Sequence, residues 1–183
     1  MDTPIATNSL VLGRLLSRQA LYRPDHLAVA FEDERLSYAE FNARVNRWAH
    51  ALNGLGVARG DRVATLLPNC LEGLATYWAC AKLGAAAVPL SSLLLEEGLV
   101  SLLCDARPRV IVSTAAFAPM LAAVRPRLAF IPAPTIVLVD AEASGERYGL
   151  IIPGVHLAPD RGPEHRHRCL AALALFGRED GVA

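Results

Sequence analysis

The sequence is almost free of lysine. Lys82 is the single lysine among the 18 basic residues, and all the others are arginines. A reaction that requires a lysine at a fixed position could therefore use only Lys82. Neither sign of charge is in excess, because 18 acidic residues balance the basic ones. A dedicated nucleic-acid-binding protein usually carries a basic excess or a basic face, so that class is disfavoured.

Segments that direct a chain into or across a membrane are also missing. Residues 1–10 lack the basic start and apolar run of a signal peptide. The longest mostly apolar stretch, 83–95, is interrupted by Gly84 and Pro89 and is too short to span a bilayer. We therefore expect neither secretion nor a transmembrane segment.

Cysteine is scarce, and no two cysteines have the C-x-x-C spacing that many metal and redox sites use. Neither a disulfide framework nor a metal site follows from their positions, so we expect reduced thiols in a cytoplasmic protein. The four residues are Cys70, Cys80, Cys104 and Cys169.

The first part of the chain predicts a helix, a hairpin and a second helix. Apolar residues at helical spacing predict a helix over 10–21, namely Leu12, Leu15, Leu16 and Ala20. Apolar residues on either side of the charged turn 32–35 predict a β-hairpin. Ser37 and Glu40 have the spacing of a capping box, which begins a helix. The apolar stripe of that helix is Phe41, Val45, Trp48, Leu52 and Leu55, and Gly56 follows as a left-handed cap.

From residue 62 onward, short apolar strands alternate with helices. Asn69 is expected to cap the first of these helices, which carries Leu74 and Trp78 inward, and Gly84 to end it. Leu95 and Leu102 are expected inward in the next helix. Apolar strands separated by helices are typical of a parallel sheet covered on both faces. We therefore predict a doubly wound α/β fold over 62–140, with strands at 62–67, 85–90, 109–112 and 135–139 and helices at 69–83, 94–104 and 116–124.

The last part of the chain loses this pattern. We expect an N-terminal subdomain over 1–153 and a poorly specified tail over 154–183, in which 170–176 has the composition of a short helix. The tail also contains residue types that bind metals, but their spacing of two and the lack of a second cluster favour a tail without a metal. These residues are His156, His165, His167 and Cys169.

Several blocks between residues 23 and 112 occur in an order and spacing that resemble a known family. They include Pro-Asp-His-Leu-Ala-Val at 24–29, Leu-Ser-Tyr-Ala-Glu-Phe at 36–41, Gly-Asp-Arg-Val-Ala at 60–64 and Ala-Cys-Ala-Lys-Leu-Gly-Ala-Ala-Ala-Val-Pro-Leu at 79–90. This stretch resembles the opening of the adenylate-forming enzymes, the AMP-binding acyl-CoA synthetase and ligase family. The resemblance is to the N-terminal subdomain of a much longer enzyme.

The resemblance implies a ligase that works in two steps. A carboxylate attacks the α-phosphate of ATP to give an acyl-adenylate, and a thiol, usually coenzyme A, then accepts the acyl group. This chemistry uses a Ser/Thr/Gly-rich phosphate loop closed by a lysine, an acidic residue for magnesium, an aspartate for the ribose and a second lysine in a C-terminal domain. ATP, magnesium and coenzyme A are thus implied for the full-length family.

None of these residues can be placed in the sequence. Lys82 matches the helix position just before the Leu-Gly-Ala block, and we expect it at a solvated helix end, where the helix dipole favours a cation. We nominate no catalytic, cofactor-binding or metal-binding residue. We expect a chain truncated before the phosphate loop and inactive alone, with an apolar face that favours self-association.

Two alternatives remain open. The chain could be a non-catalytic interaction or regulatory module that docks on a ligase, or an unrelated small α/β enzyme. If the ligase resemblance holds, fatty, aromatic and amino acids are all open as the carboxylic acid substrate.

Overall fold

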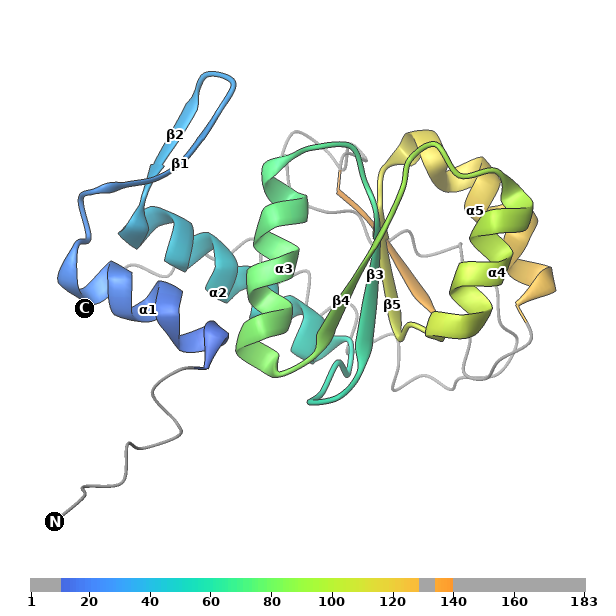
Figure 1. Cartoon of the computed structure of the whole chain (residues 1–183), viewed down its shortest axis with the longest axis horizontal. Helices are drawn as coiled ribbons and strands as arrows, with labels where there is room; N and C mark the ends of the chain where they lie inside the picture. Colours follow the sequence, from blue (N-terminus) through green and yellow to red (C-terminus); the bar gives the residue numbers. More distant parts are fainter. Residues whose placement is uncertain (1–10, 129–133, 140–183) are drawn as a thin grey trace, which may run out of the picture.

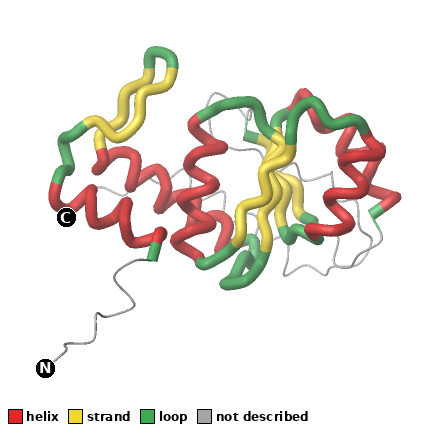
Figure 2. The backbone as a smooth tube through the Cα atoms, in the orientation of Figure 1, coloured by secondary structure: helices red, strands yellow, loops and turns green. Residues whose placement is uncertain are grey.

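The computed structural model describes residues 11–128 and 134–139. A four-stranded parallel sheet with helices on both faces lies at one end, and an N-terminal helix and a hairpin lie at the other (Figures 1 and 2). The described part of the chain confirms the predicted doubly wound α/β fold. The predicted tail, its short helix and its four candidate metal ligands lie outside the described residues, so the division at residue 153 stays a prediction.

The parallel sheet has the strand order β4-β3-β5-β6. Neighbouring strands pair in parallel, as with Val63 beside Ala87 and Val110. Each strand is short and apolar, as expected for strands covered on both faces. Their bounds are β3 Arg62–Leu66, β4 Ala86–Leu90, β5 Val110–Ser113 and β6 Thr135–Leu138.

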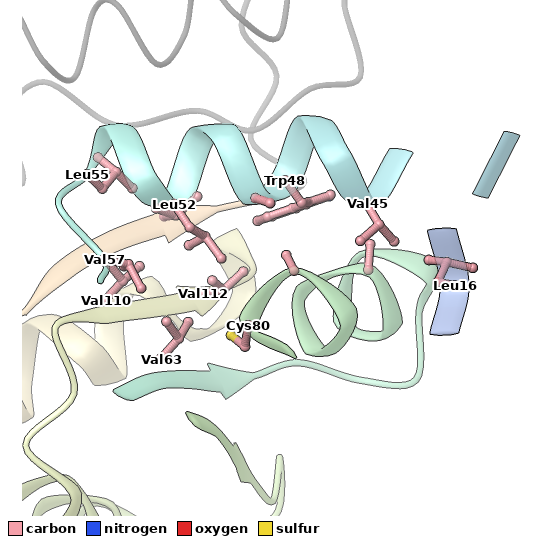
Figure 3. Close-up of a cluster of buried hydrophobic side chains, with 14 of the residues drawn as sticks. Leu16, Val45, Trp48, Leu52, Leu55, Val57, Val63, Cys80, Val110 and Val112 are labelled. Carbon is pink, nitrogen blue, oxygen red and sulfur yellow. The ribbon is translucent and has the colours of Figure 1, made fainter. Parts of the chain in front are cut away.

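Helices α2 (Tyr38–Gly54) and α3 (Leu71–Leu83) cover one face of the sheet. Their core includes Val63, Val110 and Val112 from the strands (Figure 3). Helices α4 (Glu96–Ala106) and α5 (Ala118–Val124) cover the other face, over Ala64, Leu66 and Ile111. Alternate strand residues thus enter different cores, because side chains of a strand point to opposite faces. Two short 3₁₀ helices, η2 (Ala115–Phe117) and η3 (Arg125–Arg127), flank α5.

The N-terminal part comprises α1 (Leu12–Tyr22) and a hairpin of β1 (Leu27–Phe31) and β2 (Glu34–Ser37). The hairpin turn is tighter than predicted, since β2 already begins at Glu34 and Glu32 takes a positive φ of 49°. The capping box is confirmed: the Glu40 amide donates to Ser37 Oγ at 3.3 Å, and the Ser37 amide donates to Glu40 Oε2 at 2.8 Å.

The predicted stripe of α2 is confirmed, with all of its five residues buried. Trp48 and Leu52 lie over the sheet and α3 in Figure 3. Leu74 and Trp78 on α3 are only half-buried at the edge of the same core. Gly56 has the predicted left-handed conformation, with φ at 86°.

Two predictions about helix ends and faces are wrong. The cap of α3 is Cys70 rather than Asn69, because the helix begins one residue later, and Cys70 Sγ accepts a hydrogen bond from the Gly73 amide. Helix α4 begins at Glu96, which leaves Leu95 before the helix and exposed, and Leu102 is 43% exposed on its outer side. The predicted first helix is confirmed as α1; of the four residues whose spacing predicts it, Leu16 alone is buried, while Leu12 and Leu15 are exposed.

Strand β4 is less buried than the sequence predicts. It lies at one edge of the described sheet, where no described strand pairs with its outer side, and Ala86 and Pro89 are exposed. Proline is tolerated at such an edge because a missing amide leaves no interior hydrogen bond unmade.

Candidate functional site

The single lysine joins three helices. Lys82 lies in the last turn of α3 and its ammonium donates three hydrogen bonds. One goes to Ser17 Oγ on α1 at 2.9 Å, and the other two go to Asn42 Oδ1 and Asn46 Oδ1 on α2, both at 2.6 Å. All three protons of the ammonium are therefore directed at protein oxygens.

This arrangement corrects the expected solvated position of Lys82. Its side chain is half-buried, and burial lowers the pKa of Lys82 below its usual range. Its oxygen partners are neutral, because they are a serine hydroxyl and two asparagine amides. The ion pairs found among the described residues do not include Lys82. With every donor occupied by α1 and α2, Lys82 holds helices together and has no proton left for a phosphate.

Sequence reasoning missed this cluster. Its members are separated by up to 65 positions along the chain, so no local pattern reports it. The one available signal is the pair Asn42 and Asn46, which share a helix face at a spacing of four beside an apolar stripe.

The carboxyl edge of the parallel sheet is a second candidate position for a binding site. In doubly wound folds, ligands bind beyond the strand ends where the strand order reverses. Here the reversal lies between β3 and β5, because the chain runs outward from β3 to β4 and then returns past β3 to β5.

The described residues at this reversal are polar but bring no set of charged groups together. Ser113 Oγ, at the end of β5, is buried and donates to the Leu66 carbonyl of β3 at 2.9 Å. Thr114 follows, 9% exposed, and η2 starts directly after it. Glu72, in the first turn of α3, lies 3.7 Å from the Arg44 guanidinium. Within 11–128 and 134–139, this edge offers hydroxyl hydrogen bonds and neither a glycine-rich loop nor a lysine.

Cys70 and Cys80 are poor nucleophiles. Burial raises the pKa of the Cys80 thiol to about 11, and burial also raises the pKa of Cys70. A thiol attacks or binds a metal as the thiolate, so both groups are inert near neutral pH. Cys70, Cys80 and Cys104 form no disulfide. Within 11–128 and 134–139, no three side chains of metal-binding type come together.

Among the residues that the structure describes, no helix has the length and hydropathy needed to cross a membrane.

Comparison with known proteins gives one family. The family model described as AMP-binding enzyme matches residues 16–157. Long-chain-fatty-acid–CoA ligase FadD13 of Mycobacterium tuberculosis is 38% identical over 116 residues, which cover 62% of this chain and 23% of that protein. Crotonobetaine/carnitine–CoA ligase of Salmonella arizonae is 37% identical over 101 residues, covering 52% of this chain and 20% of that protein.

A solved structure supports the same family. The Mycobacterium tuberculosis fatty acyl CoA synthetase superposes with a TM-score of 0.62 at 36% identity, over 68% of this chain and 25% of that one. The chain thus spans between a fifth and a quarter of the length of these relatives. The residues that the family model matches, 16–157, contain the sheet, its helices and the Lys82 cluster.

Proposed function

The chain belongs to the AMP-binding enzyme family, and on that premise we propose that it forms the N-terminal α/β portion of an AMP-dependent acyl-CoA ligase. Such a ligase uses ATP to convert a carboxylic acid to an acyl-adenylate and then transfers the acyl group to coenzyme A. The family match over residues 16–157 carries this proposal. It is supported by the parallel sheet, which superposes on a fatty acyl CoA synthetase.

We further propose that the chain alone does not form the adenylate. Ser113, the buried hydroxyl at the carboxyl edge, is engaged with the Leu66 carbonyl. Lys82 is engaged with α1 and α2, and the sequence holds no second lysine. ATP, magnesium and coenzyme A would be held by segments of the longer enzyme outside the part of the chain described here.

The N-terminal portion does not identify the carboxylic acid substrate of the ligase. Two relatives with 38% and 37% identity are named for different acids, a long-chain fatty acid and crotonobetaine or carnitine. Because the identity is almost equal, resemblance in this region does not select between such acids, and we assign only the class.

The location and association state belong to the same proposal. A cytoplasmic location is supported by the free thiols of Cys70, Cys80 and Cys104, since disulfides are favoured in oxidising compartments. Self-association is supported by Leu93 and Leu95, which are 88% and 79% exposed after β4. Exposed apolar surface of this kind favours contacts between copies.

The test has two arms. In the first, the purified chain is assayed for ATP–pyrophosphate exchange against fatty, aromatic and amino acids, and we expect no exchange above a blank without protein. In the second, the matching 116 residues of FadD13 are replaced by those of this chain, and we expect the chimera to catalyse exchange. The control is FadD13 with the same residues deleted.

Each arm can contradict a different part of the proposal. Exchange by the chain alone would show that it holds an adenylation site. A folded chimera without exchange, beside active FadD13, would show that this sheet does not serve as a ligase portion and would favour a non-catalytic module.

A further inference from the structure

The two most exposed large apolar side chains among the described residues lie at the start of α4. Leu93 is 88% exposed, and Leu95, the residue just before the helix, is 79% exposed. Figure 1 shows α4 at the end of the molecule away from α1 and the hairpin. Exposed leucines that belong to one patch favour contact with a partner.

An apolar stripe continues from Leu95 along one side of α4. Gly98 and Leu102 follow at intervals of three and four residues, which places them on the same side of the helix as Leu95. Leu102 is 43% exposed, and Gly98 is half-buried. The core-facing side of the helix is formed by Leu99 and Leu103, which are fully buried. The three residues Leu95, Gly98 and Leu102, which we call the α4 stripe, therefore remain open to solvent.

Gly98 allows a second helix to approach α4 closely. It has no side chain and lies between the two leucines of the α4 stripe, and the distance between packed helices depends on the side chains at their contact. When two copies of α4 cross in antiparallel orientation at Gly98, Leu95 of each copy lies opposite Leu102 of the other. The α4 stripe is thus complementary to itself, as the interface of a two-fold symmetric dimer has to be.

We propose that two copies of the chain pair through the α4 stripe, with their α4 helices antiparallel and crossing at Gly98. The inference deepens the self-association proposed above and rests on it, but it does not require that the chain serves a ligase. Two pairs of leucines lose their contact with water in this arrangement, which is the main gain on pairing. Leu93 precedes the stripe by two residues and extends the apolar surface.

The charges around the α4 stripe are compatible with a second copy. In an antiparallel pair the N-terminal end of each α4 lies beside the C-terminal end of the other, so the two helix dipoles attract each other. Glu97, next to the crossing, is paired with Arg127 at 2.6 Å. Glu96 lies on the other side of the helix from the crossing, because residues two apart do not share a side. The exposed Asp105 is followed by Arg107, so that end carries one charge of each sign.

The open edge of the sheet is a poorer place for two copies to meet. No described strand pairs with the outer side of β4. The Ala86 amide donates to the Asp61 carbonyl at 2.8 Å, toward β3, so the alternating backbone directs position 89 outward. That position is Pro89, which has no amide hydrogen to donate. An edge that lacks a donor resists pairing with another strand, which leaves the leucines of α4 as the contact.

Sedimentation velocity of the full 183-residue chain over a series of concentrations tests the pairing. The patch is small, so we expect a weak dimer whose population rises with concentration. Leu95→Lys and Leu102→Glu should each lower the association constant by roughly tenfold or more, because each puts unpaired charges into an apolar contact. The double variant should regain most of this loss, because each lysine then faces a glutamate of the other copy. Leu21→Ser removes an exposed leucine from α1 and should leave the association constant unchanged.

A cysteine at the crossing gives a second readout. Gly98→Cys places two thiols opposite each other at the two-fold axis, so mild oxidation should link two chains through a disulfide. Within the chain, a Cβ at this position would meet Leu94 Cδ2 at 3.2 Å, the end of a flexible side chain. Ala122→Cys, at an exposed position of α5, is the matched control and should stay monomeric. Both variants keep the natural cysteines, so the difference between them is the result.

Circular dichroism checks that each variant is folded. A chain that sediments as a monomer at every concentration would overturn the proposal, as would a double variant that associates as weakly as the single ones. Equal weakening by Leu21→Ser and Leu102→Glu, or equal linking of Gly98→Cys and Ala122→Cys, would also overturn it. The FadD13 chimera tests the ligase portion separately. An active chimera beside a monomeric chain would refute the pairing alone, and an inactive chimera beside a dimeric chain would refute the ligase portion alone.

Discussion

Helix α1 contacts α3 at a glycine, and this contact gives a sharp test of the fold. A Cβ atom added at Gly13 would lie 2.8 Å from the carbonyl carbon of Ala81 and from the Cα of Lys82, and closer still to the Ala81 carbonyl oxygen. These are backbone atoms that cannot rotate away, so Gly13→Ala must push α1 off α3.

The cost has two bounds. Forcing extra atoms into a close contact typically costs about 1–3 kcal/mol. If α1 instead separates from α3, Leu16 is exposed, which costs about 1.5–3 kcal/mol. The hydrogen bond between Ser17 and Lys82 adds about 0.5–1.5 kcal/mol. Because the chain takes the cheaper route, we expect Gly13→Ala to destabilise docking of α1 by about 1–3 kcal/mol.

Limited trypsin digestion reads out this docking, since Arg18 lies on α1 and is exposed. A helix that opens more often is cleaved faster in proportion to its open population. We therefore expect cleavage after Arg18 to accelerate by roughly 5- to 150-fold, which is the free energy above converted to an equilibrium ratio.

The matched control is Gly98→Ala in α4. Its added Cβ would meet only Leu94 Cδ2, at 3.2 Å, the end of a flexible side chain. Replacing a helical glycine by alanine should leave stability unchanged or raise it by up to about 1 kcal/mol. If both variants were cleaved after Arg18 at the rate of the original chain, α1 would not lie against the backbone of α3.

Two other residues test the core. Trp48 is 7% exposed in the α2 stripe, so Trp48→Ala should destabilise the chain by about 3–5 kcal/mol in urea unfolding, and the half-buried Trp78 should cost less on the same substitution. Equal, small losses for the two would refute the orientation of α2. Burial raises the pKa of Cys80 from 9.0 to about 11, so the folded chain holds this proton more tightly than the unfolded chain. Its contribution is fully present below pH 9.0 and is lost as the pH rises through about 11, by up to about 3 kcal/mol. Cys80→Ala should flatten this alkaline loss measured by unfolding, and an unchanged slope would show that the thiol is accessible.

Much of the fold is readable in the sequence because it depends on local patterns. The stripe from Phe41 to Leu55 repeats at helical spacing, and all of it is buried. The capping box at Ser37 and the left-handed Gly56 require only neighbouring residues. Strands that are apolar on both faces, alternating with helices, already require a covered parallel sheet. The resemblance to the AMP-binding family lies in the same region and is confirmed by the match over 16–157.

The failures occur where a residue's surroundings come from distant parts of the chain. Leu12, Leu15 and Leu16 have the same hydropathy, but α1 meets α3 at Gly13, so the crossing of two helices decides that Leu16 alone of these three is buried. Lys82 looks like an ordinary cation at a helix end until α1 and α2 bring Ser17, Asn42 and Asn46 to its ammonium. Local spacing determines which segments become helices and strands. Only the arrangement of those segments in space determines which face of each is covered, and what each polar group bonds to.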